Sequence, residues 1–153
     1  MRAALTAAEL ERRLAAEFPE AFYPGCGLTI ASVAPRCARV RLVPDPRATR
    51  PGGTVSGPVL MMLADVTMYI AVLASIGWVP LAVTTNLNIN FLRKPMPGAL
   101  VADCALLRLG KRLAVGTVTI CCEGDDAPVA HATSTYSLPP HSKGLADGII
   151  EPK

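Results

Sequence analysis

Charged and aromatic residues are both scarce in this chain of 153 residues. Only 18% of the residues are charged and 5% are aromatic, whereas 51% are hydrophobic. This composition excludes a disordered chain and is sufficient for one buried core. It also leaves little polar surface for a monomer. We therefore expect an apolar face to be buried against a second copy of the chain.

Signatures of several large functional classes are missing. The net charge is only +3, and no arginine-rich run interleaves with aromatic residues, so nucleic acid is not an expected partner. The sequence has no GxGxxG, Walker A or GxSxG motif. A Rossmann dehydrogenase, a P-loop NTPase and a serine hydrolase therefore lack support.

The cysteine pattern does not indicate a metal site or a disulfide framework. The count is odd and no CxxC occurs, so we expect no metal, no cofactor and no disulfide. Reduced, buried thiols are typical of the cytoplasm, which is the predicted location. The cysteines are Cys26, Cys37, Cys104, Cys121 and Cys122.

Targeting and membrane segments are also not indicated. The first 18 residues alternate charge with alanine and contain no apolar core typical of a secretory signal. One membrane-like stretch, residues 66–83, is interrupted by Gly77 and Pro80. A membrane-spanning helix needs about 20 apolar residues. We therefore expect a buried helix of a soluble protein and no membrane partner.

The hydrophobic pattern predicts one α+β domain over residues 1–153, with a core at about 25–138. Thr6 and Glu9 form a capping box for a helix over about 6–18. An apolar helix is expected over 57–76 because Pro58 suits a first helical turn and Gly77 a helix end. A polar tail follows at 139–153. Strands are predicted at 28–33, 38–43, 84–92, 100–109, 113–122 and 129–138, with a long loop at 44–55.

The element order predicts the architecture. One long helix lies between two strands and four, and only this helix is long enough to cover one face of a mostly antiparallel sheet. We therefore expect the sheet to wrap around it. Residues 84–92 alternate strictly, which places the asparagines on the face opposite the apolar side chains. The asparagines are Asn86, Asn88 and Asn90, and the apolar residues are Leu87, Ile89 and Phe91.

Asp65 is the main candidate for chemistry. It lies among Leu63, Ala64 and Val66 inside the apolar helix, where an unpaired carboxylate would be costly. One interpretation is a structural carboxylate paired with an arginine or a backbone amide. The other is a general base or nucleophile.

Gly57 is the second candidate, at the expected helix start. Backbone N–H groups there lack partners and, with the helix dipole, could stabilise a developing oxyanion. Eight residues of helix, roughly 12 Å, separate Gly57 from Asp65. Two antiparallel helices from two subunits could bring them together, whereas Gly57 alone could simply be a flexible entry to the helix.

Three segments carry a resemblance to a known family. TVSGPVLMMLAD, residues 54–65, resembles the helix entry of hotdog thioesterases of the phenylacetyl-CoA (PaaI-like) type, which normally reads His-Gly-Gly, a short apolar run and Leu-Ala-Asp. AVTTNLNINFLRKP, residues 82–95, is similar to the next segment of that family, and LGKR, residues 109–112, to its basic turn. The similarity covers roughly residues 25–138.

The resemblance implies a hotdog fold, a homodimer or dimer of dimers, and hydrolysis of an acyl-CoA or aryl-CoA thioester, with coenzyme A as part of the substrate. Asp65 matches the acidic catalyst, Gly57 the glycine whose amide polarises the carbonyl, and Thr84 a hydroxyl that helps to place water. The positions expected to contact substrate are Arg50, Ser56, Pro58, Met61, Asn86, Arg93, Lys94, Gly110, Lys111 and Arg112.

Three positions depart from the family pattern. Ser56 replaces the usual histidine, Pro58 replaces the second glycine, and Arg50 stands where some relatives carry an asparagine. Loss of the histidine leaves room for a non-catalytic acyl-CoA sensor as an alternative. It disfavours a hotdog hydratase, whose chemistry uses a histidine. Lys111 and Arg112 fit either CoA phosphates or an ordinary charged hairpin turn.

Overall fold

Six long strands and two α-helices form the structure in the expected order. The computed structural model describes residues 2–140, so the expected polar tail at 139–153 lies almost entirely outside the described residues. The elements are α1 (Ala7–Glu17), β1 (Leu28–Ala34), β2 (Cys37–Leu42), η1 (Pro46–Ala48), β3 (Thr49–Arg50), β4 (Thr54–Val55), α2 (Gly57–Ile76), β5 (Val83–Phe91), β6 (Leu100–Leu109), β7 (Leu113–Cys122) and β8 (Pro128–Ser137).

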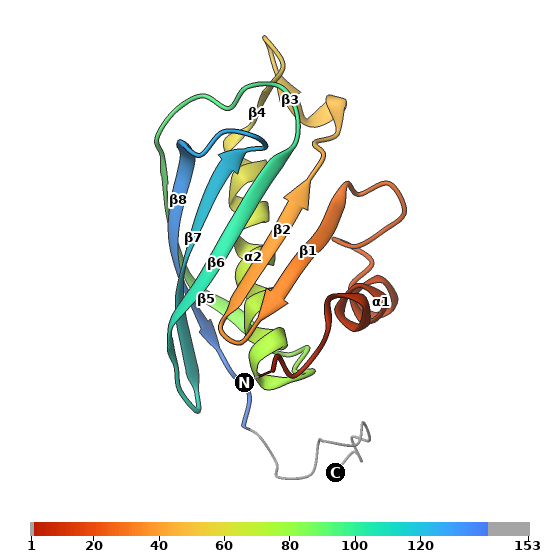
Figure 1. Ribbon diagram of the computed structural model, residues 1–153, viewed down its shortest axis with the longest axis vertical. Helices are drawn as coiled ribbons and strands as arrows, with labels where there is room; N and C mark the ends of the chain where they lie inside the picture. Colours follow the sequence, from red (N-terminus) through yellow and green to blue (C-terminus); the bar gives the residue numbers. More distant parts are fainter. Residues whose placement is uncertain (1, 141–153) are drawn as a thin grey trace.

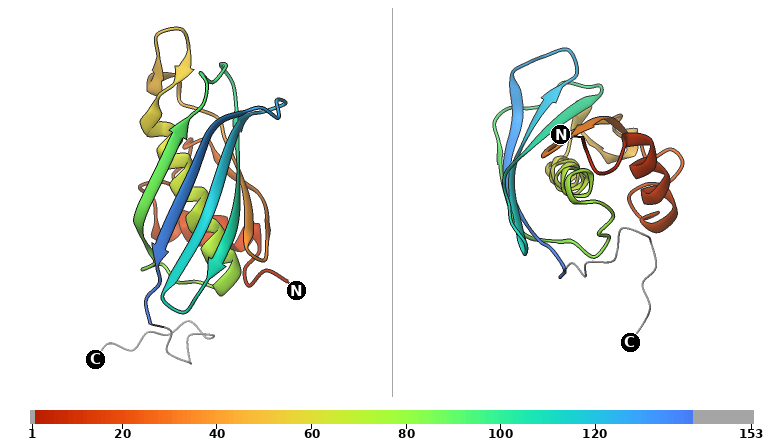
Figure 2. Two further views of the ribbon diagram at one scale, coloured as in Figure 1. Left: turned by 90° about the vertical axis from the view of Figure 1, so that its left-hand side faces the viewer. Right: turned by 60° about the horizontal axis from the view of Figure 1, so that its bottom comes forward.

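The long strands form one antiparallel sheet in the order β1-β2-β6-β7-β8-β5. The sheet curves around α2, which lies along its concave face (Figures 1 and 2). The predicted α+β architecture is therefore confirmed. The strand β5 lies at the edge of the sheet with only β8 beside it.

The helix α2 has the ends that its sequence predicts. Ser56 adopts extended backbone angles at the N-cap, Pro58 lies in the first turn, and the Gly77 N–H donates to the Leu73 carbonyl. Gly77 has φ 96°, a conformation that a side chain would disfavour.

Most of α2 is buried by the rest of the protein. By length and composition α2 could cross a membrane, but 67% of its most apolar window is buried inside the protein. Core helices share this apolar composition because they are covered on several sides. The burial of α2 accounts for its hydrophobicity without a lipid environment.

The segment at 44–55 is more ordered than the predicted loop. Asp45 accepts a hydrogen bond from the Arg47 N–H at 2.9 Å and starts the short helix η1. The strands β3 and β4 then pair as a two-stranded ribbon, with Gly52 and Gly53 at positive φ in the turn between them. The prolines and glycines there serve a cap and a tight turn, which the prediction of an open loop did not anticipate.

The first helix is fixed to the sheet by buried leucines and one carboxylate. Its capping box is present, with Thr6 and Glu9 bonded reciprocally. Leu10 and Leu14 are fully buried, and the Glu11 carboxylate accepts a hydrogen bond from the Ile30 N–H at 2.8 Å. The contact satisfies a backbone donor where β1 is irregular, so α1 also closes the outer edge of the sheet.

Three buried groups make the stability of this fold sensitive to alkaline pH. Burial raises the pKa of the Cys104 thiol from 9.0 to about 12 and that of the Tyr69 hydroxyl from 10.0 to about 12; it also raises the pKa of Tyr136. A pKa that is higher in the folded state stabilises the fold below the unfolded pKa, and this stability is lost as pH rises through the folded value. We expect the free energy of unfolding in urea to fall between about pH 9 and pH 12.

Replacing Cys104 provides the control. Cys104→Ala should lower stability at neutral pH by a small cavity cost and remove the part of the pH slope that begins near pH 9. A wild-type stability that stays constant over the alkaline range would contradict the burial of these groups.

Candidate active site

Asp65 lies in the middle of α2 and faces the strand pair β5–β8. Its carboxylate oxygen Oδ1 accepts hydrogen bonds from Thr84 Oγ1 at 2.5 Å and from Tyr136 Oη at 2.9 Å. No described residue donates a hydrogen bond to the other oxygen, Oδ2. Asp65 is half-buried and Thr84 is exposed at the sheet edge. A carboxylate held on one oxygen and open on the other is suited to act on a ligand.

A β-bulge determines how Thr84 reaches Asp65. The predicted alternation of residues 84–92 would place Thr84 on the asparagine face, away from α2. In the structure the pairing shifts between Thr84, opposite Tyr136, and Asn86, opposite Thr135. The extra residue, Thr85, reverses the alternation, so Thr84 points inward. The strict alternation was therefore wrong at this end of the strand; bulges often redirect side chains in this way.

Tyr136 is a site residue that the sequence reasoning missed. It lies in β8 directly opposite Thr84 and is 3% exposed. Burial, followed by the charge of Asp65, raises the pKa of its hydroxyl, so the group keeps its proton and donates. The available signal was the alternation of β8, which places Tyr136 on the same face as Ala132 and Ser134, toward α2. Its pairing with Thr84 could not be read from the local sequence.

The helix entry lies at the other end of β5 from Thr84. Ser56 is the N-cap of α2, but its side chain makes no capping hydrogen bond. No described residue accepts the Gly57 N–H. A methyl group at position 57 would lie 3.3 Å from the Phe91 ring, which places Gly57 beside the end of β5. Pro58 is exposed. Within one chain, Gly57 and Asp65 do not meet, as the helix length predicts.

Three other expected contact residues occupy separate places. Arg50 is exposed in the β3–β4 ribbon at the Gly57 end of α2, and Met61 is 40% exposed on the first turns of the helix. Asn86 pairs with Thr135 on the outer face of β5–β8. Asn86 therefore does not share a face with Thr84, and the two do not line the same side of the strand.

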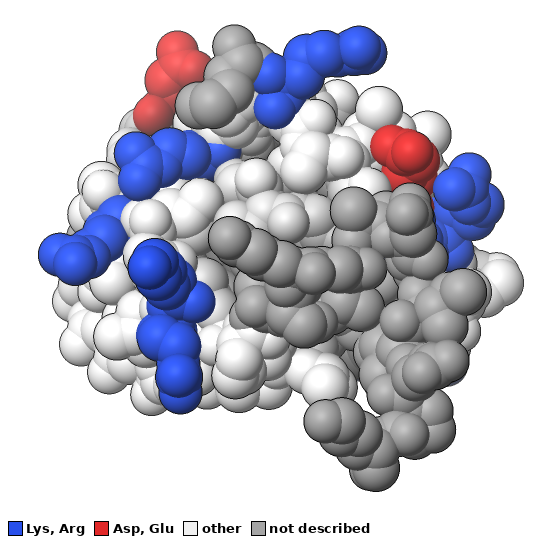
Figure 3. Space-filling model, turned by 90° about the horizontal axis from the view of Figure 1, so that it is seen from below, with Lys and Arg blue, Asp and Glu red and all other residues white. Residues whose placement is uncertain are grey.

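The basic residues divide between the two ends of the sheet. Lys111 and Arg112 are exposed, with Gly110, in the β6–β7 hairpin. The register through Leu113, Ser137 and Val83 places this hairpin at the Thr84 end of β5. Figure 3 shows Lys and Arg gathered around this end of the molecule, with few acidic side chains.

Arg93 and Lys94 follow the opposite end of β5, after Phe91. The Arg93 guanidinium donates to the Asp125 carboxylate at 2.8 Å and to the Ala127 carbonyl at 2.7 Å. It therefore ties β5 to the β7–β8 turn of its own chain. Lys94 is exposed, and no ion pair to it is found within residues 2–140.

The remaining candidates do not join this site. The His131 ring nitrogen Nδ1 lies 3.1 Å from Thr119 Oγ1 in a cross-strand pair, which fits a packed histidine of the sheet. All five cysteines are free thiols. Among the described residues no group of three or more His, Cys, Asp or Glu could hold a metal ion.

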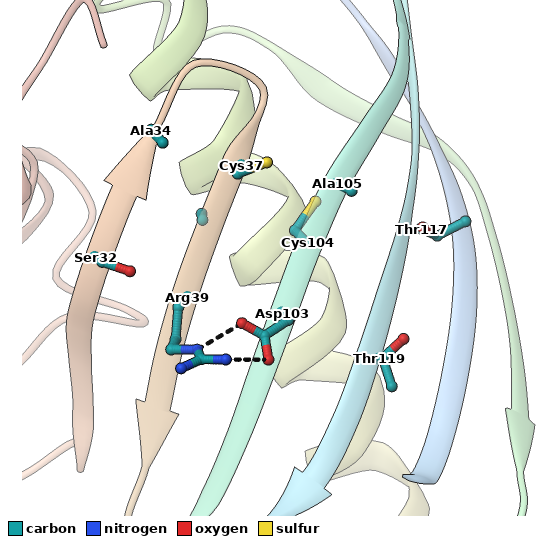
Figure 4. Close-up of a pocket in the computed structure, with 10 residues that line it drawn as sticks. Ser32, Ala34, Cys37, Arg39, Asp103, Cys104, Ala105, Thr117 and Thr119 are labelled. Carbon is teal, nitrogen blue, oxygen red and sulfur yellow. Dashed lines mark hydrogen bonds and ion pairs between the residues drawn. The ribbon is translucent and has the colours of Figure 1, made fainter. Parts of the chain in front are cut away.

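A shallow depression of about 430 Å³ lies on the sheet, away from Asp65. Figure 4 shows Arg39, Asp103 and Thr119 on the face turned away from α2, with Arg39 and Asp103 joined as an ion pair. Both charges are matched and about half exposed. The depression therefore presents no unpaired charge.

Comparison with known proteins identifies the family. A model of the thioesterase superfamily matches residues 52–129, the segment that contains Gly57, Asp65 and Thr84. A candidate thioesterase from a Silicibacter species is 43% identical, with 92% of this chain and 96% of that chain covered and a TM-score of 0.82. The chain belongs to the thioesterase superfamily.

Other solved structures agree with the hotdog fold expected of this superfamily. A variant of the phenylacetic acid degradation protein PaaI from Thermus thermophilus is 25% identical, covering 77% of this chain and 98% of its own, with a TM-score of 0.66. Zebrafish thioesterase superfamily member 2 is 22% identical, covering 89% of this chain and all of its own, with a TM-score of 0.76, and shows the fold alone. No curated protein matches the sequence.

Removing the Thr84 hydroxyl should weaken the support of Asp65. Thr84→Val keeps the shape of the side chain but deletes the donor to Oδ1. Hydrogen bonds to charged groups are worth about 1.5–3 kcal/mol, so we expect kcat for thioester hydrolysis to fall about tenfold or more. Thr84→Ser retains the hydroxyl and should remain within about threefold of wild type. Equal activity of the valine and serine variants would show that this contact has no role in turnover.

Proposed function

We propose that this member of the thioesterase superfamily hydrolyses the thioester of an acyl-CoA or aryl-CoA. The observation that carries the proposal is the Asp65 carboxylate, which two hydroxyl groups hold by Oδ1 and which leaves Oδ2 without a partner among the described residues. The family match covers this residue and the helix start. Free-thiol release from a panel of short, medium, long and aryl acyl-CoAs is the direct test.

The proposed reaction uses Asp65 as a base or as a nucleophile. As a base, Oδ2 takes a proton from a water molecule, and the water oxygen bonds to the thioester carbon. The C–S bond then breaks, and the proton passes to the departing thiolate. The developing oxyanion needs a donor. Pro58 has no N–H, so the proposal assigns this role to the Gly57 amide, which has no acceptor among the described residues.

The site requires a second copy of the chain. One edge of β5 is unpaired, and apolar side chains beside it are exposed: Val83 is 57% exposed and Phe91 is 52% exposed. An unpaired strand edge is a template for another strand. The seven residue-to-residue steps from Thr84 to Phe91 span about 23 Å. Antiparallel pairing of two β5 edges would therefore bring Gly57 of the partner subunit toward Asp65.

The same dimer would bring together the basic residues that lie at opposite ends of β5 in one chain. Lys111 and Arg112 lie at the Thr84 end of β5, whereas Lys94 follows the Phe91 end. Antiparallel pairing would place Lys94 of the partner subunit near the β6–β7 hairpin. The proposal assigns the CoA phosphates to these cations. Arg93 contributes less, because its guanidinium already binds Asp125 and Ala127.

Two further proposals concern location and the alternative function. We place the protein in the cytoplasm, and the five free thiols are compatible with that reducing environment. A non-catalytic acyl-CoA sensor remains the second candidate, favoured by Ser56 where family members carry a histidine. Calorimetric binding of several acyl-CoAs without release of thiol from any of them would support the sensor.

Mixing two inactive variants should test whether the site is shared between subunits. Asp65→Asn removes the base or nucleophile and should lower kcat about 10²-fold or more. Gly57→Pro should lower it about 10²- to 10³-fold by deleting the amide donor. The backbone accepts proline here because Ser56, which precedes it, has ψ 155° and position 57 begins the helix, while the exposed Phe91 ring must shift slightly.

A co-refolded 1:1 mixture of the two variants should recover about one quarter of wild-type activity. Half of the dimers would be mixed, and each would contain one complete site of two. Each variant refolded alone is the control. No recovery, with mixed dimers verified by mass spectrometry, would contradict a site built from two chains.

The basic hairpin should affect recognition of the nucleotide more than the chemical step. Changing both Lys111 and Arg112 to alanine should raise KM for an acyl-CoA and reduce its dependence on salt, because exposed charge contacts are screened by ions. Hydrolysis of a small thioester that lacks the nucleotide should stay nearly unchanged. Equal losses on both substrates would indicate that the hairpin supports structure instead of binding CoA.

A further inference from the structure

Tyr136 makes two hydrogen bonds to the same residue. Its hydroxyl lies 2.9 Å from Asp65 Oδ1 and 3.1 Å from the main-chain carbonyl oxygen of Asp65. One hydroxyl proton is shared between these two acceptors, so the phenol oxygen is fixed relative to both the helix backbone and the carboxylate. A contact of this kind restricts rotation of the Asp65 side chain.

The two hydrogen-bond donors to Asp65 bind the same carboxylate oxygen. Thr84 and Tyr136 both donate to Oδ1, from neighbouring strands that pair at these two residues. A carboxylate oxygen has about two lone-pair sites, so Oδ1 is fully occupied. The second oxygen, Oδ2, accepts no hydrogen bond within residues 2–140. The arrangement therefore distinguishes an anchored oxygen from an available one.

The ring of Tyr136 is itself held in place. It stacks on Tyr69 with ring centroids 6.0 Å apart and planes inclined by 17°. Tyr69 in turn contacts Phe18 edge-on at 6.1 Å, and its hydroxyl donates to the Pro80 carbonyl at 3.1 Å. Such aromatic pairs favour defined geometries. The stack connects the residue that ends α1 to the carboxylate on α2.

We propose that Tyr136 is a positioning residue that anchors Asp65 by Oδ1 and thereby presents Oδ2 to the thioester. This inference rests on the proposed function, because it assigns the reactive atom of that same site. It differs from a general packing role, since it requires the hydroxyl and not the ring. It also predicts that Tyr136 acts only through Asp65.

Tyr136→Phe is the test variant because it keeps the ring and deletes only the hydroxyl. We expect kcat for acyl-CoA hydrolysis to fall about tenfold with KM changed less than about twofold, because the substrate contacts remain while Oδ2 loses its fixed direction. Tyr69→Phe is the matched control. It removes a buried hydroxyl from the same stack, but that hydroxyl binds Pro80, so kcat should remain near the wild-type value.

A double-variant comparison separates positioning from a structural effect. In the Asp65→Asn background, adding Tyr136→Phe should reduce the residual rate by less than about twofold, because a residue that acts through Asp65 has no function left. A further tenfold loss in that background would overturn the proposal. So would wild-type kcat in Tyr136→Phe, or an equal loss of kcat in Tyr69→Phe.

Crystal structures would test the anchoring of Asp65 independently of the proposed function. If the wild-type protein releases no thiol from any acyl-CoA, the thioesterase function fails, but the anchoring of Asp65 is still tested. Wild type should show one Asp65 rotamer, with Oδ1 on Tyr136. Tyr136→Phe should show a second Asp65 rotamer or a rotated carboxylate plane. An unchanged single rotamer in Tyr136→Phe would overturn the anchoring role.

Discussion

A carboxylate in the middle of the central helix is the constraint on which this structure depends. Removing Asp65 from water is unfavourable unless hydrogen bonds replace those it loses. Neither of its side-chain donors comes from α2: Thr84 is on β5 and Tyr136 is on β8. The edge strand must therefore pair with β8 in one register. A shift by one residue would turn Thr84 to the outer face and leave Oδ1 with a single donor.

This constraint explains why the bulge lies where it does. Leu87 and Ile89 must face α2 to cover the helix, and strict alternation from them would turn Thr84 outward. The extra residue at Thr85 reconciles apolar contacts along most of β5 with a polar contact at its end. Packing and site chemistry thus require opposite alternation at the two ends of β5. The bulge allows both, with one irregular strand pair as the consequence.

The features that sequence reasoning predicted well have local causes. The capping box at Thr6, the helix from Gly57 and the six long strands follow from periodicity and from Pro or Gly at element ends. Asp65 was identified because a carboxylate in an apolar run is locally anomalous. Thr84 was carried over from the family resemblance, but its inward direction depends on strand pairing. Tyr136 is 71 residues from Asp65 along the chain. In the sequence it is one of several buried residues of an alternating strand, because only the pairing register of the strands brings it to Asp65.

The residues that hold Asp65 and the residues at the entry of α2 lie in different parts of the structure. This separation suggests that chemistry and substrate selectivity are determined by different residues. The contacts to Asp65 lie between α2, β5 and β8, where any change also disturbs the sheet. The positions that depart from the family pattern, Arg50, Ser56 and Pro58, lie at the opposite end of β5, on or beside an exposed two-stranded ribbon. Substitutions there cost little stability, since they break no buried pair. In the proposed dimer this entrance faces the Asp65 of the partner subunit, so it would shape substrate access without altering the carboxylate to which the proposal assigns the reaction.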